Sequence, residues 1–393
     1  MWRYGSKVVI VQKQLLNSIT RSKITITKTP GTGKKVKKAP NIIVRDAPTT
    51  ASPKIAMPSA RKALQPPDKE RERELARLQF EIRTHHQYGN YKDALSYSKE
   101  LLKETTKLYG KDHPVTASSY NNIGLMYKLI GDWVESRKNY HESLRIYGRV
   151  VGKDHASFAA ALHNIGSLNK MQVHMDESLT AIQRLQLNEE ALEHLQDAWK
   201  IRQVELGEDH PHTISSRSYY GAALASQVIQ TSMRTKAKKS SRVTEQRWNA
   251  AEDHLRQALK QAIDISRTKE GKLKGRIRTL SAASAAQNLA VFLKSRVTEI
   301  KDDGNINILD HDVIVEAKKF YEEVLEARLE LLHEVHPDVV ATKFSLAELI
   351  STLGDEDGAN ELREQLMASY NVRQIDENDI DNGTNDSTSN QND

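Results

Sequence analysis

The sequence predicts an all-α protein, an α-solenoid of about six helical hairpins, and a recurring phrase is the main reason. Gly-Lys-Asp-His occurs at Gly110–His113 and again at Gly152–His155, which sets a period of 42 residues. Two altered copies follow, Gly207-Glu208-Asp209-His210-Pro211 and Glu334-Val335-His336-Pro337. A fixed period of this length indicates stacked helical repeats.

The residues between two copies of the phrase predict one helical hairpin. Gly110 suits the position just after a helix, where φ is positive, and Pro114 suits the first turn of the next helix. Gly131-Asp132 then separates two apolar series with helical spacing. The first series is Ile123, Met126, Tyr127 and Ile130, and the second is Trp133, Tyr140, Leu144 and Tyr147.

This unit resembles the tetratricopeptide repeat, and most closely the 42-residue form found in kinesin light chains. The family pattern of the first helix is matched by Tyr120, Ile123-Gly124 and Tyr127, and that of the second by Ser136, Tyr140 and Ser143, with serine twice replacing alanine. The resemblance covers roughly residues 68–370. It implies a superhelix whose first helices line a concave groove that binds partners.

Charge divides the chain into three parts. Residues 1–67 contain 14 Lys+Arg and one acid, residues 371–393 contain one Arg and six acids, and residues 68–370 are nearly neutral. A basic, acid-poor, Ser-containing start is typical of an organelle transit peptide, so mitochondrial localisation is predicted. A basic arm that contacts nucleic acid or an acidic surface is the alternative. We expect 371–393 to be a disordered acidic tail.

Three repeats are longer than 42 residues. The small-residue position of the first helix is Gly166, Gly221, Ala290 and Ala347 in the last four repeats. Relative to these positions, the second helices of the third, fourth and fifth repeats are displaced by 13, 18 and 15 residues. The extra residues are expected to form surface loops on one edge, and the basic one at 231–247 is a candidate surface for RNA or an acidic protein.

The sequence predicts no enzyme, metal site or cofactor. It has no cysteine, and it lacks the dinucleotide, nucleophile-elbow and zinc-protease motifs. The four junction histidines are interpreted as structural, because they are spread along the array. No apolar run reaches the roughly 20 residues of a membrane span.

The candidate binding site is the groove face of the first helices. An amide side chain and a lysine recur at matching positions in three repeats. An amide both donates and accepts, which suits a peptide backbone, and lysine suits carboxylates. A merely polar helix face is the alternative interpretation. The predicted groove residues are Arg83, Asn121, Asn122, Lys128, His163, Asn164, Lys170, Gln287, Asn288 and Lys294.

The predicted function is a non-enzymatic scaffold that binds a peptide or protein in an organelle. A cytoplasmic cargo adaptor similar to kinesin light chains is one alternative, although residues 1–67 lack the sustained heptads of a motor-binding coiled coil. An RNA-associated component of an organellar ribosome is the other. The sequence does not specify the partner, the oligomeric state or the pathway.

Overall fold

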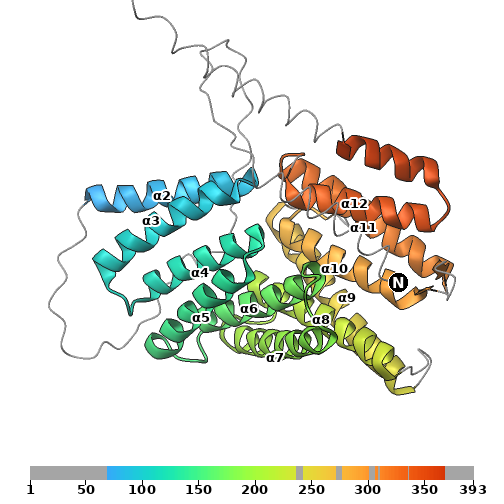
Figure 1. Ribbon diagram of the computed structural model, residues 1–393, viewed down its shortest axis with the longest axis horizontal. Helices are drawn as coiled ribbons and strands as arrows, with labels where there is room; N and C mark the ends of the chain where they lie inside the picture. The colour runs from blue at the N-terminus through green and yellow to red at the C-terminus, as the bar shows by residue number, and fades with distance from the viewer. Residues whose placement is uncertain are drawn as a thin grey trace, which may run out of the picture. The chain divides into compact units, whose positions relative to one another are not determined.

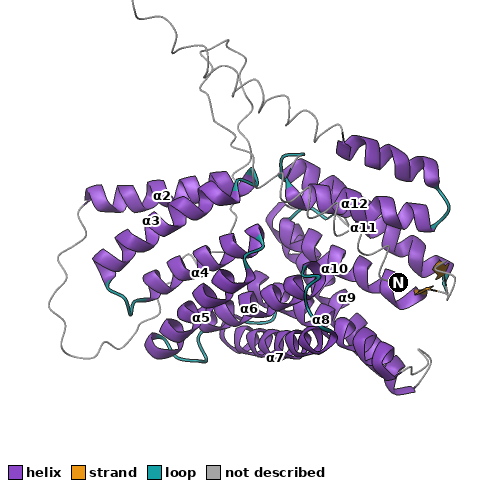
Figure 2. Cartoon of the chain, in the orientation of Figure 1, coloured by secondary structure: helices purple, strands orange, loops and turns teal. Residues whose placement is uncertain are grey.

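The computed structural model describes residues 69–235, 242–270, 277–300, 306–308, 310–334 and 336–367 of the 393-residue chain. The predicted leader, 1–67, and the predicted acidic tail, 371–393, lie outside these residues. The described part is helical apart from one pair of three-residue strands (Figure 2). The all-α fold class is therefore confirmed.

Consecutive helices in the described residues pair into six hairpins (Figure 1). The first helix of each hairpin carries the small-residue position, and the second helix packs against it. The pairs are α2 (Lys69–Gln87) with α3 (Tyr91–Tyr109), α4 (Pro114–Ile130) with α5 (Trp133–Val150), α6 (Ala156–Met175) with α7 (Ala181–Leu206), α8 (Pro211–Thr235) with α9 (Arg242–Glu270), α10 (Leu280–Val297) with α11 (His311–Leu331), and α12 (Pro337–Thr352) with a helix over residues 356–367.

The chain forms two compact units, and each is described by itself. The amino-terminal unit contains α2 to α5 and ends at Lys153. The carboxy-terminal unit begins at Asp154 and contains α6 to α12 and the helix over 356–367. Its buried core runs through α8, α9, α10, α11 and α12, with Leu255, Leu289 and Val324 among the most buried side chains.

The repeated histidine begins the first helix of four hairpins. In each case the imidazole Nδ1 accepts a hydrogen bond from the backbone N–H two residues later, which satisfies one of the free donors at the helix start. An Nδ1 that accepts carries no proton. The structural interpretation of these histidines is confirmed. The pairs are His113 with Val115 (3.2 Å), His155 with Ser157 (3.0 Å), His210 with His212 (3.2 Å) and His336 with Asp338 (3.1 Å).

A second device joins each hairpin to the next, and we call it the junction clasp. A residue near the end of a second helix bonds a hydroxyl 14 residues further on, in the next first helix. In the amino-terminal unit Thr105 pairs with Ser119 at 3.0 Å. In the carboxy-terminal unit the clasps are arginines, Arg202 with Ser216 and Arg328 with Thr342.

The small-residue position lets two helices approach closely. A Cβ on Gly124 would lie 2.7 Å from the Tyr140 ring, and one on Gly166 would lie 2.6 Å from Leu195. The buried Ser136 hydroxyl donates to the Gly124 carbonyl at 2.7 Å. Packing, rather than backbone strain, therefore favours glycine here.

The long repeats differ from the expectation of simple loops. Most extra residues lengthen helices: α7 begins at Ala181, where Thr180 and Gln183 form a capping box, and α8 and α9 extend to Thr235 and from Arg242. The third insertion contains the unpredicted strands β1 (Thr298–Ile300) and β2 (Ile306–Ile308), which pair antiparallel. Residues 236–241 and 301–305 lie outside the described residues.

Candidate peptide-binding face

The first helices of the carboxy-terminal unit contact one another through polar side chains. His163 of α6 lies 3.2 Å from the Ser216 hydroxyl of α8, measured at Nδ1, and its ring packs edge-on against Tyr219 at 4.8 Å between centroids. Asn288 of α10 donates to the Ser218 hydroxyl of α8 at 3.0 Å. Helices α6, α8 and α10 therefore present a continuous surface, which we call the first-helix face.

The predicted groove residues all lie on first helices, but they are divided between the two units. Arg83 is exposed on α2 and donates to the backbone oxygen of Gln79. The other nine are partly buried. Those of the amino-terminal unit are Asn121, Asn122 and Lys128 on α4, and those of the carboxy-terminal unit are His163, Asn164 and Lys170 on α6 with Gln287, Asn288 and Lys294 on α10.

Part of this set is already used to hold the fold. The Asn288 amide and the His163 imidazole each bond a serine of α8. Their hydrogen bonds connect one repeat to the next, so their loss would loosen the face as well as change its chemistry. The prediction that every amide in the row serves a ligand stays untested, and these two contacts give Asn288 and His163 a structural role.

The two lysines of the carboxy-terminal unit have different surroundings. Lys294 Nζ lies 3.8 Å from the Glu348 carboxylate of α12. Burial lowers the pKa of Lys294, and Glu348 opposes that effect. Burial lowers the pKa of Lys170 to about 7, and no anion compensates. Lys170 is therefore the less satisfied cation of the pair.

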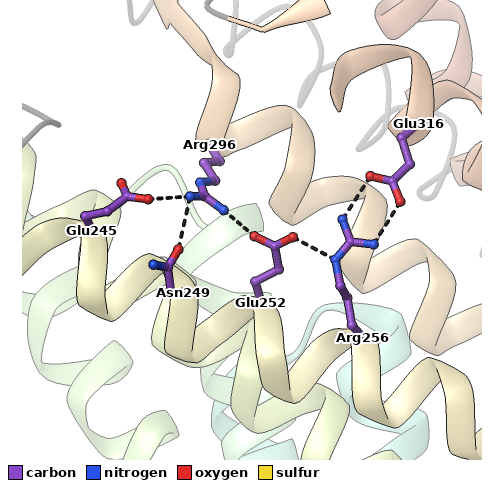
Figure 3. A network of polar contacts seen from close by, with 6 residues as sticks. All are labelled: Glu245, Asn249, Glu252, Arg256, Arg296 and Glu316. Atoms are coloured by element: carbon purple, nitrogen blue, oxygen red, sulfur yellow. Dashed lines mark hydrogen bonds and ion pairs between the residues drawn. The ribbon is translucent and has the colours of Figure 1, made fainter. Parts of the chain in front are cut away.

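The arginines of the second helices contrast with Lys170, because acids of the chain itself neutralise them. Figure 3 shows Arg296 of α10 contacting Glu245, Asn249 and Glu252 of α9. Arg256 of α9 also contacts Glu252, and it holds Glu316 of α11 through two bonds of 2.8 and 2.9 Å. This network links α9, α10 and α11 and leaves little positive charge for a ligand.

Other kinds of site receive no support from the described residues. In that part of the chain, no three His, Asp or Glu side chains gather closely enough to hold a metal ion. None of its helices combines the length and low charge needed to cross a bilayer. A pocket beside Ile277 and Arg278 has a volume of about 10 Å³, which is room for about one water molecule.

Sequence reasoning missed the contribution of α8 and α12 to the face. Ser216, Ser218 and Glu348 contact predicted residues, yet none of them was predicted. A signal existed for Ser218, since it stands three residues before Gly221 just as Gln287 stands three before Ala290. The lysine-and-amide pattern hid it, because α8 carries no lysine at the matching position.

Comparison with known proteins identifies the repeat. A family model described as Tetratricopeptide repeat matches residues 116–157 and 181–212. The first match spans one predicted 42-residue period and covers α4 and α5. The chain thus contains tetratricopeptide repeats, as the sequence predicted. The comparison with curated proteins finds no match.

Solved structures with a similar arrangement include bacterial and fungal proteins. BtubC (BKLC) from P. vanneervenii is 14% identical with a TM-score of 0.41, and the match covers 83% of this chain and 96% of that one. A putative kinesin light chain from Podosopora anserina with nearly identical TPR-like repeats is 15% identical with a TM-score of 0.29, covering 77% and 96%. The apo quorum sensor NprR from B. thuringiensis is 11% identical with a TM-score of 0.27, covering 76% and 86%.

Proposed function

We propose that the chain is a non-enzymatic scaffold that binds an extended segment of a partner protein along the first-helix face. The observation that carries this proposal is the contact of α6, α8 and α10 through polar side chains. Successive first helices thereby offer hydrogen-bonding groups at regular intervals. An extended peptide presents its own backbone groups at regular intervals, which suits such a surface.

The two chemistries on the face have separate roles in this proposal. Amides such as Asn164 and Gln287 bond the peptide backbone, because each offers both a donor and an acceptor. Lysines bind acidic side chains. Asn122 and Lys128 of α4 have the same spacing from Gly124 as Asn164 and Lys170 have from Gly166, so the amino-terminal unit is proposed to bind by the same means.

The proposed location is the mitochondrion, supported by the basic and acid-poor composition of residues 1–67. A fluorescent protein fused after residue 67 tests it. Mitochondrial fluorescence is the expected result. A diffuse cytosolic signal would favour the cargo-adaptor alternative, and nuclear accumulation would indicate that the cluster of lysines at 34–38 is an import signal.

Matched variants test the binding face. The full chain and its Asn122→Ala/Asn164→Ala/Gln287→Ala variant are used to capture proteins, which are quantified by mass spectrometry. The control is Glu193→Ala/Asp197→Ala on the exposed side of the second helix α7. Each lost hydrogen bond is worth about 0.5–1.5 kcal/mol, so a true partner should be depleted by the first variant and retained by the control. A partner that both variants retain equally would contradict the proposed face.

A further inference from the structure

Two lysines of the carboxy-terminal unit occupy the same place in the repeat. Lys170 stands four residues after Gly166, and Lys294 stands four residues after Ala290. The partner of Lys294 is Glu348, which follows Ala347 in the next first helix, at 3.8 Å. The repeat thus shows where a carboxylate lies when a lysine at this position is satisfied.

The matching carboxylate is missing beside Lys170. The residue that follows Gly221 in the next first helix, α8, is Ala222, and residues 222–230 contain no titratable side chain. In the described part of the chain, Lys170 Nζ has no hydrogen bond or ion pair. The corresponding position on α8 therefore leaves a partly buried amine facing an alanine.

The other charged groups around α6 do not replace that carboxylate. Nearby cations come from α6 itself, where His174 is one turn further on, and from α7, where Arg184 donates to the carbonyls of Val173 and Asp176. The nearby acids have partners of their own. Gln172 and Ser178 bond the Asp176 carboxylate, and Asn169 bonds Glu190 at 3.1 Å.

We propose that Lys170 forms a subsite for the carboxylate of an acidic side chain in an extended peptide, which takes the place that Glu348 takes beside Lys294. This inference rests on the proposed function and names the ligand chemistry at one position of the face. Charge complementarity supports an acidic ligand, since Lys170, His174 and Arg184 contribute the local charge. Partial burial keeps solvent from screening the pair fully.

Proton uptake should accompany binding at this subsite. Burial lowers the pKa of Lys170 to about 7, so near neutral pH a substantial fraction of the amine is uncharged. A carboxylate beside it favours the ammonium form and raises that pKa again. Affinity for an acidic peptide should therefore fall as the pH rises above 7, whereas affinity for an uncharged peptide should not.

The geometry can be tested without a ligand. In the full chain, Ala222→Glu introduces the carboxylate that the repeat lacks here, and Ala222→Gln is the control of equal size. The pKa of Lys170 is measured by NMR after 13C-methylation of the lysines, with Lys170→Arg to assign the signal. The glutamate should raise this pKa by about 1–3, and the glutamine should leave it nearly unchanged. An equal pKa in both variants would overturn the proposed position of the carboxylate.

A capped peptide with one central glutamate, and its glutamine counterpart, test the ligand. The glutamate peptide should raise the pKa of Lys170 and should bind about tenfold more weakly to Lys170→Met and Ala222→Glu than to the unaltered chain. Glu348→Ala should make Lys294 respond to the same peptide. Equal binding of both peptides, or a response only to a peptide with a free terminal carboxylate, would overturn an acidic side chain as the occupant.

Sodium acetate separates failure of this subsite from failure of the proposed function. If acetate raises the pKa of Lys170 but neither peptide binds, the carboxylate subsite is supported and the peptide scaffold is refuted. If acetate and Ala222→Glu leave that pKa unchanged while the peptides still bind in a manner sensitive to Gln287→Ala, the subsite is refuted and the scaffold stands.

Discussion

The junction clasps of the two units use different chemistry at the same positions. In the amino-terminal unit, two neutral hydroxyls meet, those of Thr105 and Ser119. In the carboxy-terminal unit, Arg202 is 5% exposed and donates to both the His212 carbonyl and the Ser216 hydroxyl. The separation of 14 residues is the same in both units. The repeat therefore conserves the spacing of the junction while its charge changes.

This difference has energetic consequences. A neutral hydroxyl pair contributes about as much as an ordinary hydrogen bond, and removal of one partner leaves one small polar group. A buried guanidinium fills more volume and satisfies two acceptors, so its removal leaves both a cavity and unpaired oxygens. We therefore expect the carboxy-terminal unit to depend on its clasp more strongly than the amino-terminal unit does.

The largest expected effect is that of Arg202→Ala. Loss of the guanidinium should lower the free energy of opening α7 and α8 by about 2–4 kcal/mol, because the His212 carbonyl and the Ser216 hydroxyl lose their donor. Thr105→Ala should cost about 1 kcal/mol at α3 and α4. Local opening is measured by native-state hydrogen exchange, since repeat proteins open in parts. Equal costs in the two units would contradict the comparison.

The next effect concerns the small-residue position. Gly124→Ala should destabilise the amino-terminal unit by about 1–3 kcal/mol, because the new Cβ would lie 2.7 Å from the Tyr140 ring. Gly221→Ala should cost less, since its nearest neighbour is Leu255 at 3.0 Å. Thermal unfolding followed by circular dichroism compares the two variants. A larger loss for Gly221→Ala would show that the flexible leucine cannot move aside.

Two serines of α5 should respond in opposite directions. Ser136→Ala should cost about 1 kcal/mol, because its hydroxyl bonds the Gly124 carbonyl. The Ser143 hydroxyl is buried and has no partner in the described residues. Ser143→Ala should therefore stabilise the unit by about 0.5–1 kcal/mol. Denaturant unfolding of both single variants gives the sign, and a loss for Ser143→Ala would indicate a bound water at that hydroxyl.

Particular residues show how far the sequence could predict the fold. The histidine caps and Gly124 repeat as visible letters, so periodicity alone placed them. The clasps do not, because Thr105, Arg202 and Arg328 differ in type although they share a position. The strands β1 and β2 were not predicted, since three residues each are too few for a periodic signal.

The candidate site was predicted less completely than the fold. The sequence placed Lys170 and Lys294 correctly on first helices, but it made them equivalent. Their difference depends on Glu348 and Ala222, which are far away in the chain and close only after folding. A pattern read along one helix could not reveal the neighbouring helix that supplies or withholds a carboxylate.

The smallest expected effect is a pH dependence at the start of α8. Burial, and then the charge of Arg202, lower the pKa of His210 below its usual 6.5, and burial with Arg202 and His210 lowers that of His212 to about 4. The unfolded chain therefore takes up these protons before the folded chain does. Stability from the two histidines is complete above pH 6.5 and is lost as the pH falls toward 4.

Hydrogen exchange of the first turn of α8 between pH 7 and 4.5 measures this loss. Protonation of His210 would remove the acceptor that caps the His212 N–H, so protection there should fall by about 0.5 kcal/mol, the lower end of what a cap contributes. In Arg202→Met the pKa of His210 should rise toward 6.5 but stay below it, because burial is the larger cause. The folded and unfolded pKa values then differ less, and the loss of protection with acid should become shallower. An unchanged slope would show that Arg202 acts on this junction through its hydrogen bonds alone.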